Sequence, residues 1–215
     1  MSRKQFIMLL GIGGVALLLI IIMLGSLIPD REPETVTVTR QGVPVATLET
    51  KATDPVLGKR NAPVTVFVFS DFGCDHCASV VPVLKELVKK HDNVRVVWKD
   101  APVTQFPAPS APAHLAARCA ARQNKFWEYH DKLFEQQTQL TEATFLNIAQ
   151  ELKLKEEPFK SCLAEKKLQP LVDANLALAQ SLGIDGTPYF FIDDERFSGS
   201  RTLEFLEDAV KRAAL

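Results

Sequence analysis

The sequence has few cysteines, no surplus of either charge, and no repetitive glycine or proline pattern. Four cysteines in 215 residues are too few for a small disulfide scaffold, although they suffice for two pairs. A net charge of −1 argues against a chain kept disordered by charge repulsion, and against a nucleic-acid-binding protein with its usual basic surplus. Ten glycines and thirteen prolines exclude a collagen-like architecture. With 47% hydrophobic residues, the chain can form a globular core beside an additional segment.

Charge is absent from a long N-terminal run, residues 6–28, where Ser26 is the one polar side chain. A helix of this length spans roughly 34 Å, more than the ~30 Å hydrocarbon core of a bilayer. Arg3 and Lys4 precede the run, so the positive-inside rule predicts residues 1–5 in the cytoplasm and the rest of the chain outside. We interpret the run as a single-pass transmembrane anchor. A cleaved signal peptide is the main alternative, but the run is long for one and lacks a good small-x-small site; a buried core helix is another.

A stalk is predicted after the anchor, at residues 29–57. This segment is rich in threonine, glutamate and proline. It contains two short alternating stretches, at 35–39 and 43–50, and the second could form an edge strand.

Strands and helices are predicted in mixed order beyond the stalk. An apolar β-branched run, an amphipathic helix interrupted by Pro82 and a second strand form a β-α-β unit, which implies parallel strands. A helical region, a strand pair and a closing helix follow. The predicted elements are strands at 64–69, 94–98, 189–192 and 196–197, and helices at 75–91, 111–123, 125–137, 141–152, 156–165, 168–182 and 202–213.

The chemistry is expected at Cys74 and Cys77, a C-x-x-C pair at the junction of the first predicted strand and helix. At a helix N-terminus, unpaired N–H groups and the macrodipole favour a thiolate, so the pKa of Cys74 should fall. Cys77 lies one turn further on, close enough for a disulfide, so that one thiol attacks and the other resolves the mixed disulfide. His76 can add positive charge or a hydrogen bond to the Cys74 thiolate.

Other interpretations of the pair are haem attachment, a metal site and an inert disulfide. Haem attachment fails because Ala78, not histidine, follows the pair. A zinc site needs a second pair at similar spacing, and Cys119 and Cys162 are isolated in the sequence. The position between a strand and a helix, in an exported chain, favours redox chemistry over a metal site or an inert disulfide.

Gly186-Thr187-Pro188 directly precedes the predicted strand at 189–192. Proline can open a strand, where its missing N–H matters least. A cis Thr187–Pro188 bond would turn the backbone of Thr187 towards another site. X–Pro bonds are trans in about 95% of cases, so it is the C-x-x-C context that favours cis here.

Residues from about 56 to 215 resemble the DsbA-like branch of the thioredoxin superfamily. The resemblance rests on Pro82 and on three stretches, VLGKRNAPVTVFVFSDFGCDHC, FWEYHDKLF and SLGIDGTPYFFID. It implies an α/β thioredoxin fold over 58–215 with an inserted all-helical domain at 103–182. It also implies that Cys74 attacks, that Cys77 resolves, and that Pro188 is a cis-proline facing them. We assign supporting roles at this site to Asp75 and Thr187.

The resemblance implies a thiol–disulfide oxidoreductase, and the run at residues 6–28 predicts that it is membrane-anchored; we expect it to need no bound cofactor or metal. Its domain would lie on the periplasmic or extracellular side of the cell membrane and oxidise reduced or unfolded exported proteins. A quinone-linked membrane partner of the DsbB or VKOR type would recharge it. The alternatives are a reductase, an isomerase, for which residues 30–56 are short for a dimerisation domain, and a copper-binding module, which lacks a surrounding Met or His cluster.

Two positions depart from the family pattern. Asp75 stands where relatives often have proline after the first cysteine, and Val68 stands where many carry a buried glutamate. The departures bear on the redox direction, not on the fold. We expect a mild oxidase, with a Cys74 pKa below about 7.

Cys119 and Cys162 both face apolar stripes of the predicted helical region. Two buried free thiols are one possibility, but an oxidising compartment favours a second, structural disulfide between them. Of the histidines, His114 falls in the first turn of a predicted helix, and His130 is expected to pack rather than to catalyse.

Overall fold

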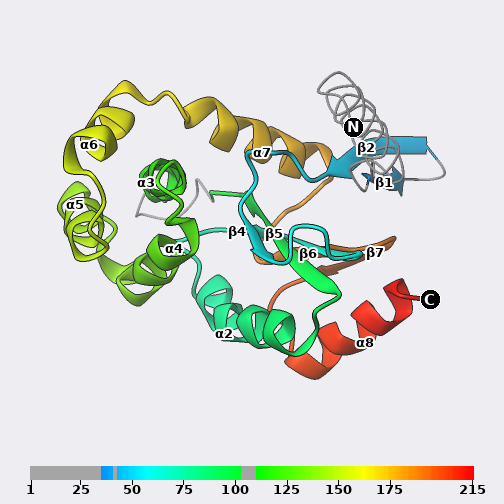
Figure 1. Ribbon diagram of the computed structural model, residues 1–215. Helices are drawn as coiled ribbons and strands as arrows, with labels where there is room; N and C mark the ends of the chain where they lie inside the picture. The colour runs from blue at the N-terminus through cyan, green and yellow to red at the C-terminus, as the bar shows by residue number, and fades with distance from the viewer. Residues whose placement is uncertain (1–34, 41–42, 103–109) are drawn as a thin grey trace, which may run out of the picture. The chain divides into compact units, whose positions relative to one another are not determined.

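The computed structural model describes residues 35–40, 43–102 and 110–215 (Figure 1). The predicted anchor at 6–28 lies outside these ranges, as do residues 103–109, which open the predicted insertion. Among the described helices, none is both long and apolar enough to cross a membrane.

The strands are β1 (Thr35–Arg40), β2 (Val43–Glu49), β3 (Val56–Gly58), β4 (Val64–Ser70), β5 (Val94–Asp100), β6 (Tyr189–Ile192) and β7 (Glu195–Ser198). The helices are α2 (Asp75–Lys90), α3 (Ala111–Ala121), α4 (Phe126–Glu135), α5 (Glu142–Glu151), α6 (Glu156–Glu165), α7 (Gln169–Ser181) and α8 (Leu203–Ala213), with a 3₁₀ turn η1 (Gln137–Gln139).

A five-stranded sheet in the order β3-β5-β4-β6-β7 forms the centre of the domain. β4 and β5 run parallel, with Val64 opposite Val94 and Ser70 opposite Asp100. The pairs β3–β5, β4–β6 and β6–β7 are antiparallel. The predicted β-α-β unit is therefore present, and every element predicted beyond residue 63 has its ends within two residues of those expected.

Both faces of the central strands are buried, which explains why their sequences are continuously apolar. On one face, Val66 and Val68 pack in a cluster with residues of α2, α8 and the helical region. On the other face, Phe67 and Phe69 pack with Leu48 and with residues of α7. The alternation of a strand thus sends successive residues of β4 into two separate clusters.

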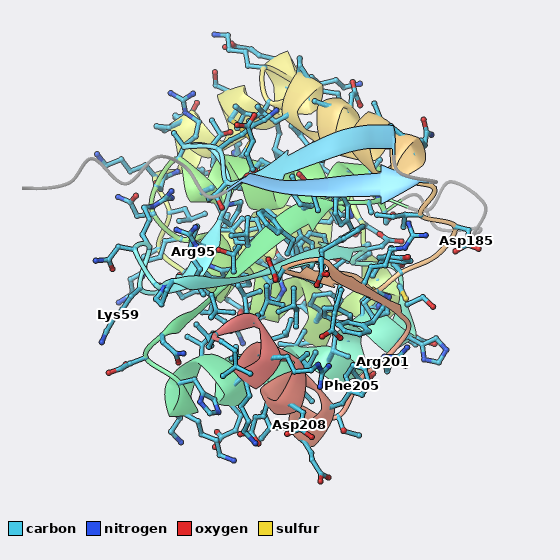
Figure 2. All side chains as sticks on the ribbon, turned by 90° about the vertical axis from the view of Figure 1, so that its right-hand side faces the viewer. Lys59, Arg95, Asp185, Arg201, Phe205 and Asp208 are labelled. Atoms are coloured by element: carbon cyan, nitrogen blue, oxygen red, sulfur yellow. A yellow bond between two sulfur atoms is a disulfide. The ribbon has the colours of Figure 1, made fainter. Side chains whose placement is uncertain are left out.

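Helices cover the two faces of the sheet, as Figure 1 shows. α2 and α8 contact each other and the sheet on one side, while α7 contacts β5 and β2 on the other. The helical region α3–α7 occupies the place of the predicted insertion, from Ala111 to Ser181. Figure 2 shows Arg201 and Phe205 at the start of α8, where the guanidinium lies 5.1 Å from the ring centroid.

The predicted stalk is wrong over its second half. Leu48 is fully buried. The Lys99 ammonium donates to the carbonyl of Glu49 (3.0 Å), and the Arg118 guanidinium donates to the carbonyl of Thr53 (2.7 Å). β3, which was not predicted, forms an edge of the central sheet. Residues 48–57 thus belong to the domain because of contacts with residues far along the chain, which local composition does not reveal.

Candidate active site

Cys74 occupies the N-cap position of α2, immediately after a tight loop that leaves β4. Its carbonyl accepts hydrogen bonds from the backbone N–H groups of Cys77 (3.0 Å) and Ala78 (3.1 Å), so the first turn of the helix closes on it. Its own N–H donates to the carbonyl of Asp71 at 3.2 Å. The Cys74 side chain therefore stands at the positive end of the helix dipole.

The half-buried Cys74 thiol is acidic. Its pKa falls from 9.0 to about 6, mainly because the Cys77 thiol hydrogen-bonds to the thiolate. Burial opposes the fall, while the Thr187 side chain and the backbone N–H groups of Cys77 and His76 add to it. At neutral pH Cys74 is a thiolate, in agreement with the expected pKa below about 7.

Cys77 is fully buried, and its thiol is much less acidic than that of Cys74. Burial raises its pKa well above 9.0, and the neighbouring Cys74 thiolate raises it further. Its Sγ atom accepts a hydrogen bond from the backbone N–H of Asp71 at 3.5 Å. Both cysteines are free thiols in this structure, which therefore represents the reduced pair. A neutral Cys77 beside an ionised Cys74 suits a pair with one attacking and one resolving thiol.

The loop before β6 faces the pair. The Thr187–Pro188 peptide bond is cis, as the sequence predicted. The Cys74 Sγ atom lies 3.3 Å from the carbonyl oxygen of Thr187. The Pro188 carbonyl accepts from the Gly199 N–H at 2.7 Å, which connects the loop to β7. Residues far apart in the sequence thus meet at the reactive sulfur.

Asp75 and His76 both have exposed side chains at the start of α2. The hydrogen bond by which His76 lowers the pKa of Cys74 comes from its backbone N–H, so it does not depend on the imidazole. The His76 carbonyl accepts from the hydroxyls of Ser79 (2.7 Å) and Ser200 (3.2 Å). The predicted contribution of the imidazole stays a prediction, and the backbone N–H of His76 adds to it.

A buried polar cluster adjoins the pair, and the sequence analysis did not identify it. His114 Nε2 lies 3.1 Å from Oδ1 of Asp71, and its Nδ1 lies 2.8 Å from Oδ1 of Asp100. Asp71 directly follows β4 and Asp100 ends β5, so the adjacent carboxyl ends of two parallel strands bring them together. The position of the two aspartates at adjacent strand ends could have been recognised from the sequence. That His114 of α3 lies between them could not. The other partners of Asp100 are Trp98 Nε1, Arg118 and Asn175.

The cluster is charged. Burial alone lowers the pKa of His114, but the hydrogen bonds and charges of Asp100 and Asp71 outweigh it and raise the pKa. Burial would raise the pKa of both carboxyls; His114 lowers that of Asp71, and Arg118 together with His114 lowers that of Asp100. Both ring nitrogens of His114 thus face carboxylate oxygens, which favours its imidazolium form, and the Arg118 guanidinium pairs with Asp100.

Comparison with known proteins shows which family the chain belongs to. A family model described as thioredoxin matches residues 50–212. The chain belongs to the thioredoxin family. It is 27% identical over 171 residues to disulfide bond formation protein D of Bacillus subtilis, covering 74% of this chain and 76% of that protein. A thioredoxin-like oxidoreductase from Silicibacter pomeroyi shares its structure with a TM-score of 0.70 and 32% identity, covering 76% of this chain and 94% of the other.

Another relative is much longer. The Na(+)/H(+) antiporter NhaA 3 of Salinispora tropica is 36% identical over 160 residues, which make up 74% of this chain but 24% of the antiporter. The chain thus spans about a quarter of the length of this relative. The resemblance to the thioredoxin superfamily inferred from the sequence is confirmed.

Val68, one of the departures from the thioredoxin-family pattern, is fully buried among apolar residues of β4, α2 and α8. The position therefore carries no proton acceptor for Cys77. In this thioredoxin-family chain the buried carboxyl of Asp71 lies instead in the loop that bonds to the Cys77 sulfur.

Cys119 and Cys162 form the predicted structural disulfide. It joins α3 to α6, with a Cα–Cα distance of 5.8 Å and a sequence separation of 43. Cys119 is buried, and Cys162 is partly buried. The helical insertion of this thioredoxin-family domain is thus cross-linked away from the reactive pair.

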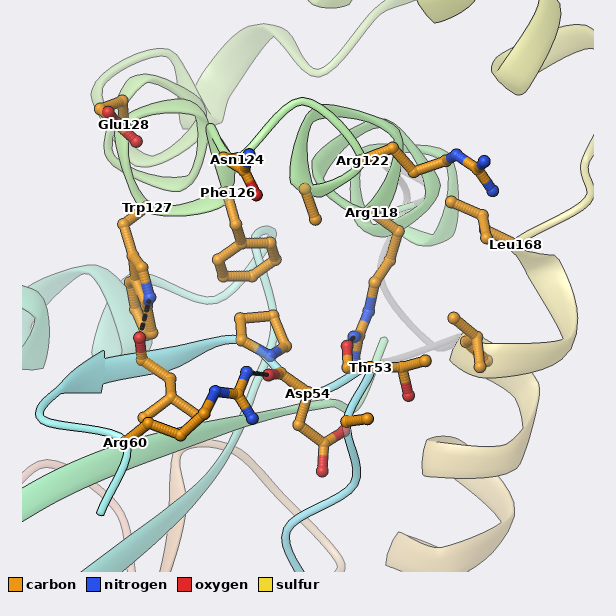
Figure 3. Close-up of a pocket in the computed structure, with 15 residues that line it drawn as sticks. Thr53, Asp54, Arg60, Arg118, Arg122, Asn124, Phe126, Trp127, Glu128 and Leu168 are labelled. Atoms are coloured by element: carbon orange, nitrogen blue, oxygen red, sulfur yellow. Dashed lines mark hydrogen bonds between the residues drawn. The ribbon is translucent and has the colours of Figure 1, made fainter. Parts of the chain in front are cut away.

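A pocket of about 450 Å³ lies between residues 52–60 and helices α3 and α4 (Figure 3). Trp127 Nε1 donates to the carbonyl of Val56 (2.9 Å), and the Arg60 guanidinium donates to the carbonyl of Asp54 (3.3 Å). Its lining includes neither Cys74 nor Cys77. The reactive pair of this thioredoxin-family chain is consequently separate from this pocket.

Proposed function

We propose that the chain is a thiol–disulfide oxidoreductase that introduces disulfides into exported proteins. The observation that carries the proposal is the acidity of Cys74, whose pKa of about 6 makes it a thiolate at neutral pH. A stabilised thiolate favours the reduced form, so the Cys74–Cys77 disulfide becomes an oxidant. The name of the Bacillus subtilis relative, a disulfide bond formation protein, agrees with this direction.

The exchange has two steps. A substrate thiolate attacks Sγ of Cys74 in the oxidised pair; a Cys74–substrate bond forms, the Cys74–Cys77 bond breaks, and Cys77 leaves with the electron pair. Cys77 then takes up a proton, because its pKa is raised by burial. A second substrate thiolate attacks the substrate sulfur of the mixed disulfide and releases the Cys74 thiolate. The substrate loses two electrons and the cysteine pair gains them.

The proposal includes an extracytoplasmic location. Residues 6–28 would hold the domain at the outer face of the cell membrane, since they are uncharged and follow Arg3 and Lys4. The substrates would be reduced or unfolded exported proteins. A quinone-linked membrane thiol oxidase of the DsbB or VKOR type would restore the disulfide.

Redox titration of the pair tests the direction. Equilibration with glutathione at defined ratios gives its reduction potential; a value near about −120 mV supports an oxidase, and one near about −270 mV supports a reductase. In parallel, the oxidised protein should transfer its disulfide to a reduced, unfolded secretory protein. Cys74→Ser and Cys77→Ser should both abolish the transfer, because neither variant can form the Cys74–Cys77 disulfide. Mixed with a substrate that already carries a disulfide, reduced Cys77→Ser should accumulate a mixed disulfide at Cys74, because it lacks the thiol that resolves it. A potential close to the reductant value would overturn the proposed direction.

Fractionation of cells tests the location. The full chain should remain with membranes after a high-salt wash, and its domain should be accessible to protease from outside. N-terminal sequencing of the mature protein should find residues 1–5. A soluble product beginning near residue 28 would contradict anchoring.

A further inference from the structure

Asp71 connects the reactive cysteines to the buried polar cluster. Its backbone N–H donates to Sγ of Cys77 at 3.5 Å, while its side-chain Oδ1 faces His114 Nε2 at 3.1 Å. The same Oδ1 accepts from the backbone N–H of Gly73 at 3.2 Å. The loop between β4 and α2 is therefore folded around one carboxylate, and the direction of the Asp71 N–H depends on how that carboxylate is held.

The hydrogen bonds at this point form a directed chain. The Asp71 N–H donates to the Cys77 sulfur, and the neutral Cys77 thiol in turn hydrogen-bonds to the Cys74 thiolate. Consecutive hydrogen bonds polarise one another, so each member orients and strengthens the next. The group that holds the Asp71 side chain in place thus influences the ionisation of Cys74, although that group contacts neither sulfur atom.

We propose that His114 is a positioning residue for the cysteine pair: held between Asp71 and Asp100, it fixes the Asp71 carboxylate and thereby the N–H that Asp71 donates to Cys77. His114 is fully buried, so its contact with Asp71 is shielded from bulk solvent. The inference deepens the proposed function and rests on it for its biological meaning. The cluster differs in position from the buried glutamate of many relatives, which would stand at Val68. It reaches the pair through the loop that contains Asp71.

The charges around His114 explain why its imidazolium matters. Asp71 faces it from the end of β4 and Asp100 from the end of β5, while Arg118 extends from its own helix to Asp100. From α4, His130 lies against Phe72 and Trp98, the two rings that also contact His114, and burial lowers its pKa, which favours its neutral form. Without His114, the Asp71 carboxylate would keep its hydrogen bonds from Gly73 and Ser110 but would lose the contact with the imidazole ring. Its position and its pKa should then shift, and either change alters the loop.

Titration of the Cys74 thiolate by ultraviolet absorbance, in the reduced full-length protein, tests the inference. In His114→Gln the pKa of Cys74 should rise by about half a unit to one unit, because part of one charge-assisted hydrogen bond is lost. His130→Gln is the matched control. His130 is also buried and also lies against Phe72, with ring centroids 5.7 Å apart compared with 4.8 Å for His114, but its ring bonds to Asp131. The control should keep the wild-type pKa.

A double variant tests whether His114 acts through Asp71. In an Asp71→Asn background, the further change His114→Gln should leave the pKa of Cys74 where Asp71→Asn put it. An equal rise with and without Asp71 would mean that the His114 charge acts directly, and would overturn the inference. An unchanged pKa in His114→Gln, or an equal rise in His130→Gln, would overturn it as well. If His114→Gln does not fold, His114→Asn removes the same charge and permits the same comparison.

The titration needs no substrate, so it separates this inference from the proposed function. Wild-type acidity in all variants, together with normal disulfide transfer, would refute the role of His114 alone. The expected shifts in a protein without disulfide transfer would instead refute the proposed function.

Discussion

Replacing Cys77 should have the largest effect on Cys74, because the Cys77 thiol is the main cause of the lowered Cys74 pKa. Cys77→Ala removes the donor and leaves a small apolar side chain in a buried position. The helix N-terminus and the backbone N–H groups of His76 and residue 77 remain. The pKa of Cys74 should therefore rise without returning to that of a free thiol.

The size of the shift follows from the bond that is lost. A hydrogen bond to a charged group contributes about 1.5–3 kcal/mol, which corresponds to about one to two pKa units. Cys74 is only half-buried, so solvent screens part of the loss and the lower end of the range applies. We expect the pKa to move from about 6 to about 7. Cys77→Ser keeps a donor at the same place and should give a smaller rise.

Two assays measure this shift. One is the thiolate absorbance of the reduced variants between pH 4 and pH 10, and the other is the pH dependence of alkylation of Cys74 by iodoacetamide. Unfolding curves should first establish that both variants are folded. If Cys77→Ala titrates at the wild-type pKa, or if Cys77→Ser shifts it as far as alanine does, the hydrogen bond from Cys77 is not the dominant cause and the reasoning is refuted.

Three further predictions follow from the same structure. Above pH 6, Cys74 stays ionised, so reduction of the pair takes up one proton and the potential should fall by about 30 mV per pH unit. Below the Cys74 pKa of about 6, reduction takes up two protons and this slope should double. Redox titration at several pH values measures both slopes. Removing the structural disulfide with Cys119→Ala and Cys162→Ala together should lower the free energy of unfolding by up to about 4 kcal/mol, from a separation of 43 residues, and an unaltered urea midpoint would contradict this. Lys99→Met should cost about 3–5 kcal/mol in the same assay, because the buried Asp54 carboxylate loses its ion-pair partner and keeps only the hydrogen bond from the Lys51 N–H among its described contacts. The double change with Asp54→Asn should recover part of that loss.

The order of strands and helices from β4 to α8 was predictable because local patterns specify it. The continuous apolar run of β4 requires burial on both faces, and the apolar stripe of α2 requires a surface to pack against. Thr141 caps α5 as its residue type favours, accepting from the N–H of Thr144. The reactive pair was also predictable from the sequence, since two cysteines one turn apart at the start of a helix have a distinctive chemistry.

Contacts between distant residues were decided only in three dimensions. The alternation at 43–50 indicated at most an edge strand, and residues 51–57 gave no periodic signal, yet Leu48 completes a core cluster with Phe67 and Phe69. The part of the His76 residue that supports Cys74 is its backbone N–H, which no residue type reveals. A stalk was a reasonable expectation from composition, and tertiary packing overturned its second half.

The sequence by itself determined the element order, the C-x-x-C pair and the loop with Pro188, because spacing along the chain and residue chemistry are local properties. The tertiary structure alone decided that Asp71 and Asp100 converge on His114 beside Cys77. Their convergence depends on the register of β4 against β5 and on where α3 docks. Such a cluster is stable only when every buried charge meets a partner, and that condition is met by the fold as a whole rather than by any one segment.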